Sequence, residues 1–316
     1  MAMSCKNPML AVRVGDQYKF VGAVNESPVA RGFLHSTDGR YIVLPCGQCY
    51  ACRINKSAEW AARCVMEAKS HEENCFITLT YNECNLPADG SLVKEDFTKF
   101  IKRLRKNTGE RIRYYACGEY GDQFGRPHFH ACLFGFKPKD LVLWKVRNGI
   151  SLYRSLTIEK AWQFRGFITV GDVTYDSAAY VARYVLKKMT GDLGKELYGD
   201  KIPPYTTMSR KPGIAADFFD EYHEQIYPND FIVIRDKLKL KPPRYFDYLY
   251  DIKNGEGSFV ENIKPSRELK SFKDFTRHMK EYTLKRVMDS AHAKEVKGLK
   301  RYRRDYVEIV DDDIEV

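Results

Sequence analysis

The sequence contains no apolar run near the roughly 18 residues that a bilayer-spanning helix requires, so it predicts no membrane protein. Its start lacks the continuous apolar stretch of a secretory signal peptide, and no GxxxxGK[ST] phosphate-binding loop is present. We find no internal repeat and no low-complexity tract. The nine cysteines are an odd number, which argues against a disulfide framework and favours a reducing compartment.

The composition is that of a globular chain with a surplus of positive charge. The 316 residues, 44% of them apolar, suffice for one large domain or for a catalytic core with appendages. Lys and Arg outnumber Asp and Glu by 52 to 42, which gives a net charge of +10. Such a balance suits a polyanionic partner, either nucleic acid or an anionic membrane surface.

Strand-like and helix-like segments alternate between residues 55 and 190, which predicts an α+β fold with an antiparallel sheet and helices over it. The predicted helices are 55–70, 94–106, 158–164 and 177–189, and the predicted strands are 75–82, 111–120, 128–136 and 167–173. We expect four parts: a Cys-rich segment (1–54), a core (55–190), a C-terminal extension (191–304) with a basic helical stretch, and an acidic disordered tail (305–316).

Two histidines separated by one residue, His128 and His130, lie in a strand-like run. Because side chains on a strand alternate between faces, both imidazoles should project together while Phe129 points into the core. Glu119 precedes His128 across a turn-rich connector, so a hairpin would bring its carboxylate alongside. Two nitrogens and one carboxylate leave positions open for water or a phosphate oxygen, which suits Mg²⁺ or Mn²⁺. The alternative is a chance pair on a half-exposed strand.

Tyr180 and Tyr184 are four residues apart in a predicted helix and share a face, which Lys187 and Lys188 continue. A tyrosine phenolate can attack a DNA phosphodiester, and neighbouring cations favour ionisation of a phenol whose pKa is ordinarily about 10. Two tyrosines permit two successive exchanges, and transesterification conserves bond energy without nucleotide hydrolysis. The alternative is a pair of amphipathic core tyrosines with lysine side chains that reach solvent.

Three segments in this order, FITLTYN, GEYGDQFGRPHFHACLFG and YVARYVLKK, resemble the motifs of HUH-type rolling-circle replication initiators. VLPCGQCYACR and SRKPGI are similar to segments of the initiators of gokushovirus-type Microviridae, so the resemblance covers most of residues 40–215. It implies a five-stranded antiparallel sheet flanked by helices. It also implies His128 and His130 as metal ligands, with Glu119 as the third, and Tyr180 and Tyr184 as nucleophiles.

The activity that this resemblance implies is a metal-dependent, site-specific endonuclease and ligase. Such an enzyme forms a 5′-phosphotyrosine intermediate at a viral origin and starts rolling-circle DNA replication. The implied partners are single-stranded origin DNA and the host polymerase and helicase, in the cytoplasm of a bacterial cell and away from any membrane. Two other interpretations stay open: an HUH relaxase or transposase, and a non-catalytic zinc-containing DNA-binding protein.

Cys46, Cys49 and Cys52 repeat the CxxC spacing that suits tetrahedral Zn²⁺, which needs a fourth ligand. Candidates for that ligand are Cys5 first, then Cys64 and His35. The pattern predicts a structural zinc knuckle that joins the N-terminal segment to the core. Free thiols in a turn are the alternative, and no thioredoxin-like βαβ pattern supports redox chemistry.

Basic residues near the predicted core are candidates for contacts with DNA phosphates. Charge of this kind supplies affinity and salt dependence but no choice of sequence. The alternative is a solvated helix face. The candidates are Lys102, Arg103, Arg105, Lys106 and Arg126.

Overall fold

The computed structural model describes residues 5, 7–14, 17–23, 41–121, 125–147, 149–187, 196, 198–235, 238–267 and 269. The described residues up to Lys56 form one unit, and those from Ser57 onward form another. Within these residues, no helix combines the length and apolar character that a membrane span requires.

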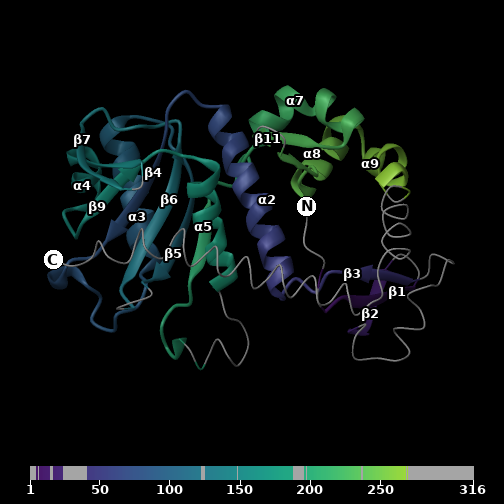
Figure 1. Ribbon diagram of the computed structural model, residues 1–316, viewed down its shortest axis with the longest axis horizontal. Helices are drawn as coiled ribbons and strands as arrows, with labels where there is room; N and C mark the ends of the chain where they lie inside the picture. The colour runs from purple at the N-terminus through teal and green to yellow at the C-terminus, as the bar shows by residue number, and fades with distance from the viewer. Residues whose placement is uncertain are drawn as a thin grey trace. The chain divides into compact units, whose positions relative to one another are not determined.

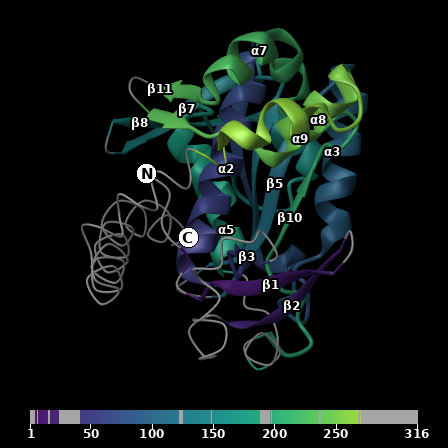
Figure 2. The ribbon, with the colours of Figure 1, turned by 90° about the vertical axis from the view of Figure 1, so that its right-hand side faces the viewer.

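The first unit holds a small antiparallel sheet with the strand order β2-β1-β3 (Figure 2). Its strands are β1 (Met9–Val14), β2 (Gln17–Ala23) and β3 (Tyr41–Leu44). Leu10 and Ala11 of β1 are buried, whereas Phe20 of β2 is 67% exposed. Helix α2 (Tyr50–Lys69) begins in this unit and continues into the second.

The second unit is built on an antiparallel sheet that has seven strands among the described residues, in the order β10-β5-β6-β4-β9-β8-β7. The strands are β4 (Asn74–Thr80), β5 (Arg113–Tyr120), β6 (Pro127–Phe134), β7 (Leu141–Arg147), β8 (Ile150–Ser155), β9 (Ile168–Gly171) and β10 (Tyr205–Met208). The sheet helices are α3 (Lys94–Thr108), α4 (Leu156–Trp162) and α5 (Tyr175–Lys187), and a 3₁₀ turn spans Glu83–Asn85.

The predicted α+β class and antiparallel sheet are confirmed, but the sheet has seven strands where the resemblance implied five. The additional β7–β8 hairpin lies at one edge. Val142 and Val146 of β7 are more than half exposed, so this strand has no regular buried face that a period-two pattern would reveal. The four predicted strands and four predicted helices between 55 and 190 all have counterparts in the structure.

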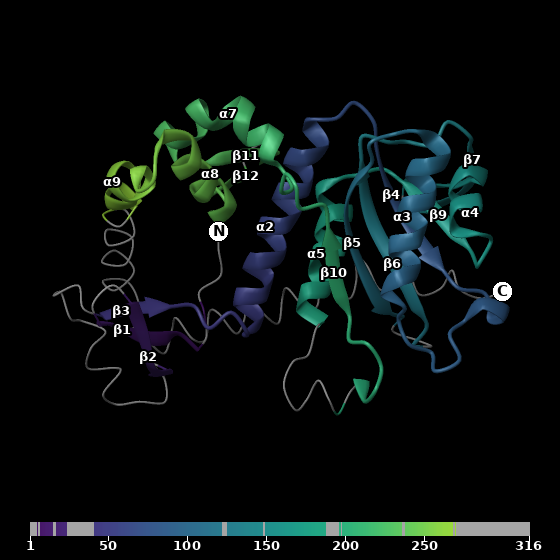
Figure 3. The ribbon, with the colours of Figure 1, turned by 180° about the vertical axis from the view of Figure 1, so that it is seen from behind.

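Helices cover both faces of the sheet, where one covered face was expected (Figures 1 and 3). On one face, α3 packs Phe97, Phe100, Ile101 and Leu104 against buried residues of β4 and β6, and α4 adds Trp162. On the other face, α2 and α5 pack against β5 and β6. Strand β6 is buried along its whole length, as expected of a central strand with both faces covered.

A further group of elements packs on the side of α2 that carries Ala62 and Met66. Its members are α7 (Ala216–Asn229), β11 (Ile232–Arg235), β12 (Leu238–Leu240), α8 (Arg244–Asn254) and α9 (Ser258–Asn262). The predicted basic stretch (266–304) and acidic tail (305–316) lie outside the described residues, apart from 266, 267 and 269.

Glu67 of α2 fastens this helix to the sheet. Its carboxylate is 1% exposed, pairs with the guanidinium group of Arg113 on β5 and accepts the backbone N–H of Ala215. Burial raises the pKa of Glu67, but the hydrogen bonds from His71, Arg113 and Ala215 outweigh it, so the pKa lies below its ordinary value. The ionised carboxylate therefore stabilises the packing of α2 on β5.

Candidate metal centre and nucleic-acid interface

The two histidines lie in the middle of the sheet, on β6. Phe129 between them packs into the core under α3, so His128 and His130 face the opposite side, toward α5. The β5–β6 register pairs Glu119 with His128 and Cys117 with His130. The predicted hairpin is confirmed, and it places the carboxylate on the same face as both imidazoles.

Glu119 joins both rings. Its Oε1 lies 2.9 Å from Nε2 of His128 and 3.0 Å from Nε2 of His130. All three side chains are buried, at 3% exposure or less. The other ring nitrogens are also held: Nδ1 of His128 is 3.0 Å from the carbonyl oxygen of Arg126, and Nδ1 of His130 is 2.9 Å from Oγ1 of Thr78.

These outer contacts determine which nitrogen can bind a cation. A carbonyl oxygen only accepts hydrogen bonds, so in a neutral His128 the proton is on Nδ1 and the lone pair of Nε2 points at Glu119. Thr78 can hold His130 in the same tautomer. A lone pair that faces a carboxylate needs either a proton or a cation between them. The arrangement therefore suits a bound metal ion.

The spacing of the donor atoms agrees with this. Two adjacent octahedral ligands, each about 2.1 Å from the ion, are about 3.0 Å apart. The measured N–O separations are 2.9 and 3.0 Å, and the three ligand atoms lie within 4.8 Å of one another. Glu119, His128 and His130 can therefore hold one metal ion between them, with further positions open to exchangeable ligands.

The electrostatics of the pocket favour an anionic carboxylate. Burial alone raises the pKa of Glu119, but the nearby imidazoles and their hydrogen bonds reverse this effect and lower the pKa from 4.5 to about 2. The carboxylate is thus ready to balance a positive charge at this position.

Tyr180 on α5 lies beside this centre. Its ring centroid is 4.9 Å from that of His130, in an edge-on arrangement, and it also meets Phe76 of β4 edge-on. The side chain is half-buried. Tyr184 and Lys187 belong to the same helix, but their side chains are not among those described, and Lys188 lies outside the described residues.

Most of the predicted phosphate-binding cations lie elsewhere. Helix α3 carries four of them and packs on the sheet face opposite the two histidines. Arg103 donates from Nε to the carbonyl of Ala161, and Arg126 is paired with Glu83. Lys102 and Lys106 are exposed on α3, and Arg105 donates to the carbonyl of Ile112. Arg105 also lines a concave surface.

That surface is a basic pocket that the sequence patterns missed, because its residues come from three separate segments. It has a volume of about 570 Å³ and is lined by five cationic side chains and no acidic one. The cations are Arg105, Arg111, Arg113, Arg210 and Lys211. Arg113 is tied to Glu67, whereas Arg111, Arg210 and Lys211 are exposed and make no ion pair within the described part of the chain. The pocket is suited to phosphate groups.

A second metal-ligand cluster lies in the first unit. The thiol groups of Cys5, Cys46, Cys49 and Cys52 come together, with all four sulfur atoms within 4.8 Å of one another. Cys64, a weaker candidate, is instead buried between α2 and the sheet beside Cys132, and His35 lies outside the described residues. Four sulfur donors can hold one metal ion.

Comparisons with known proteins place the chain in a family. Residues 74–189 match the model of the replication-associated protein ORF2 family. The chain is 36% identical to the replication-associated protein ORF2 of Spiroplasma virus 4, over 84% of this chain and 86% of that protein. It is also 36% identical to the replication-associated protein VP4 of Bdellovibrio phage phiMH2K, over 65% of this chain and 67% of that protein.

A third relative is the replication-associated protein ORF4 of Chlamydia phage 1, which is 34% identical over 64% of this chain and 52% of that protein. No solved structure matches the chain. The matched region includes both histidines, Glu119 and Tyr180. This chain therefore belongs to the replication-associated protein ORF2 family, with relatives among gokushovirus-type Microviridae.

Proposed function

We propose that this protein acts in phage DNA replication as a rolling-circle initiator that nicks and rejoins one DNA strand through a tyrosine. The observation that carries the proposal is the meeting of a buried Glu119–His128–His130 centre with the ring of Tyr180. A metal-ligand set and a phenol on facing elements provide the two groups that a phosphodiester transesterification needs. The relatives, which are named replication-associated proteins, support the biological setting.

In the proposed reaction, the phenol oxygen of Tyr180 attacks a backbone phosphorus, and the bond from phosphorus to the 3′ oxygen breaks. The phenol loses its proton and the leaving 3′ oxygen gains one. The products are a 5′-phosphotyrosine and a free 3′-OH, which a host polymerase can extend. The reverse reaction restores the phosphodiester, so the protein needs no nucleotide cofactor for either step.

The residues of the centre have separate tasks. Glu119 and the Nε2 atoms of His128 and His130 would hold Mg²⁺ or Mn²⁺, with Thr78 and the Arg126 carbonyl orienting the rings. When bound, the ion neutralises phosphate charge and polarises a non-bridging oxygen. Tyr184, one helical turn after Tyr180, is the proposed second nucleophile, and Lys187 and Lys188 are the proposed cations that favour phenolate.

The basic pocket is the proposed contact for DNA phosphates outside the cleavage site. Arg113, at its wall, starts the strand that carries Glu119 six residues later, which corresponds to about 20 Å along β5. One DNA strand in duplex geometry advances about 3.4 Å per nucleotide, so phosphates about six nucleotides from the nick could reach the pocket. We place the reaction in the cytoplasm of the bacterial host, with the host polymerase and helicase as partners.

The experiment is a covalent-adduct assay with the full chain, Mn²⁺ and single-stranded oligonucleotides that tile the genome encoding the protein. We expect a protein–DNA species that survives denaturation and requires the metal. Mass spectrometry of the linked peptide identifies the nucleophile. EDTA, or Ala at both His128 and His130, should abolish the species.

Tyrosine variants separate chemistry from binding. Tyr180→Phe combined with Tyr184→Phe should abolish the adduct and leave salt-dependent DNA binding nearly unchanged. Tyr175→Phe, on the same helix, is the matched control and should retain the adduct. An adduct that persists in the double variant refutes the nucleophile assignment. DNA binding without any adduct from the wild-type protein would favour the non-catalytic DNA-binding protein, and strand transfer between unrelated ends would favour a transposase.

A further inference from the structure

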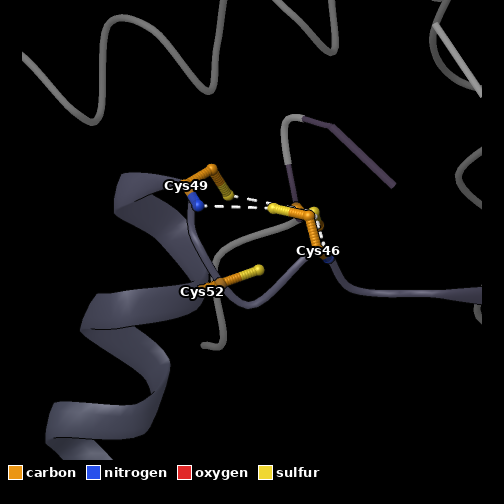
Figure 4. Close-up of side chains that lie close together, drawn as sticks. Cys46, Cys49 and Cys52 are labelled. Atoms are coloured by element: carbon orange, nitrogen blue, oxygen red, sulfur yellow. Dashed lines mark hydrogen bonds between the residues drawn. The ribbon is translucent and has the colours of Figure 1, made fainter. Parts of the chain in front are cut away.

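The four-cysteine cluster of the first unit takes no part in the reaction proposed above. Its residues come from both ends of the small sheet and from the start of α2. Cys5 precedes β1, Cys46 follows β3, and the β1–β3 register pairs Met9 with Leu44. The chain therefore brings Cys5 and Cys46 out at the same end of the sheet. Figure 4 shows Cys46, Cys49 and Cys52 with their sulfur atoms turned toward one another.

The distances distinguish a metal site from disulfides. Sγ of Cys5 is 3.5 Å from Sγ of Cys46 and 3.8 Å from Sγ of Cys49. A disulfide bond is only about 2.05 Å long, and all four cysteines are free thiols. Four sulfurs arranged tetrahedrally about an ion at about 2.3 Å are about 3.8 Å apart. The observed spacing is thus close to that of a mononuclear tetrathiolate centre.

The backbone supports charged sulfur atoms at this position. The N–H of Cys49 donates to Sγ of Cys46, and the N–H of Cys46 donates to Sγ of Cys5, both at 3.3 Å. Gly47, inside the first CxxC, has φ +74°, which a residue with a side chain adopts only with strain. This turn directs amide hydrogens at the sulfur atoms, and such bonds stabilise thiolates more than thiols.

The small sheet has little else to stabilise it. Among the described residues of its three strands, Leu10 and Ala11 are the buried ones, while Val14, Phe20 and Val21 are 47% exposed or more. Units with so small an apolar core usually need a disulfide or a metal to stay folded. A metal that joins Cys5, before β1, to Cys46, after β3, would hold the outer ends of this sheet together.

We propose that Cys5, Cys46, Cys49 and Cys52 bind one structural Zn²⁺ in a closed tetrahedral site that keeps the β1–β3 sheet folded. Four thiolates in tetrahedral positions are typical of zinc and iron sites. Sulfur atoms within 4.8 Å of one another leave room for one ion rather than a multinuclear cluster. With four protein ligands, no position remains for substrate, so the ion is structural rather than catalytic.

The first test is elemental analysis of the full-length protein, expressed in zinc- and iron-replete medium and purified without chelator. We expect one zinc and no iron per chain. Replacement by Co²⁺ should give visible ligand-field bands and an ultraviolet thiolate-to-metal absorption. Cys46→Ser with Cys49→Ser should lose the zinc. Cys84→Ser, which removes an exposed thiol outside the cluster, is the matched control and should retain it.

The second test measures the structural role by amide hydrogen exchange. In the Cys46→Ser/Cys49→Ser variant, β1 and β3 should lose protection, while β4–β6 keep it. Iron in place of zinc, no metal in the wild-type protein, equal zinc in the double variant, or unchanged protection in β1 and β3 would each overturn the proposal. None of these measurements uses DNA, so the outcome is independent of the proposed nicking activity.

Discussion

Thr78 offers a sharp test of the carboxylate–histidine centre, because it contacts a proposed ligand without being one. Its Oγ1 lies 2.9 Å from Nδ1 of His130, across the β4–β6 register that pairs the two residues. Thr78→Val keeps the shape and removes the hydroxyl. The change should leave His130 in place but free to rotate or to adopt the other tautomer, which turns the lone pair away from the metal.

Two estimates give the magnitude. A buried polar group that loses its partner costs about 1–3 kcal/mol, and loss of an outer-shell partner weakens metal binding by about 10–100-fold. Tenfold corresponds to about 1.4 kcal/mol, so the estimates overlap. Thr78 is half-buried, and water can partly replace its hydroxyl, so we expect the low end: a roughly tenfold weaker affinity.

The assay is a calorimetric titration of the protein with Mn²⁺ in the absence of DNA, followed by the Mn²⁺ dependence of adduct formation. The midpoint should rise about tenfold in both, with the maximal rate less affected. Thr80→Val is the matched control: it removes a hydroxyl on the same strand that donates to the Phe167 carbonyl at 2.7 Å. It should lower stability by about 1 kcal/mol and leave metal affinity unchanged. Equal metal affinity in the two variants would refute the role of Thr78.

The remaining predictions concern stability and DNA binding. Because the pKa of Glu67 is lowered in the folded protein, its contribution to stability is fully present above about pH 5 and is lost as the pH falls through the folded-state value. Glu67→Gln leaves Arg113 buried without an anion, so it should cost about 3–5 kcal/mol at pH 7 and flatten the fall in urea midpoint between about pH 5 and 3; an unchanged pH profile would contradict this. Charge reversal at Arg111 and Arg210 should weaken DNA binding and reduce its salt slope by about 1 per residue, whereas Lys160→Glu, outside the pocket, should have a smaller effect. Fluorescence anisotropy at several salt concentrations measures this, and equal slopes for both sets would exclude the pocket as a phosphate site.

The carboxylate–histidine centre shows which parts of a site are local. That His128 and His130 share a face follows from the alternation of a strand, and that Glu119 lies opposite His128 follows from the hairpin register. Both relations join residues that are close in the sequence, so sequence patterns predicted them. Thr78 is 52 residues from His130, and nothing in the β4 sequence marks it as a partner. It could be found only once the order of strands in the sheet was known.

The sequence by itself determined the alternating α+β pattern, the buried face of α3, the shared face of the two histidines and the CxxC repeat, because each depends on spacing within one segment. Only the tertiary structure decided which helix covers the histidines, that Tyr180 meets His130, that Cys5 rather than Cys64 completes the cysteine cluster, and that cations from three segments line one pocket. These relations depend on strand order and long-range packing. They arise when distant segments bury apolar surface together, and no periodicity within one segment records that choice.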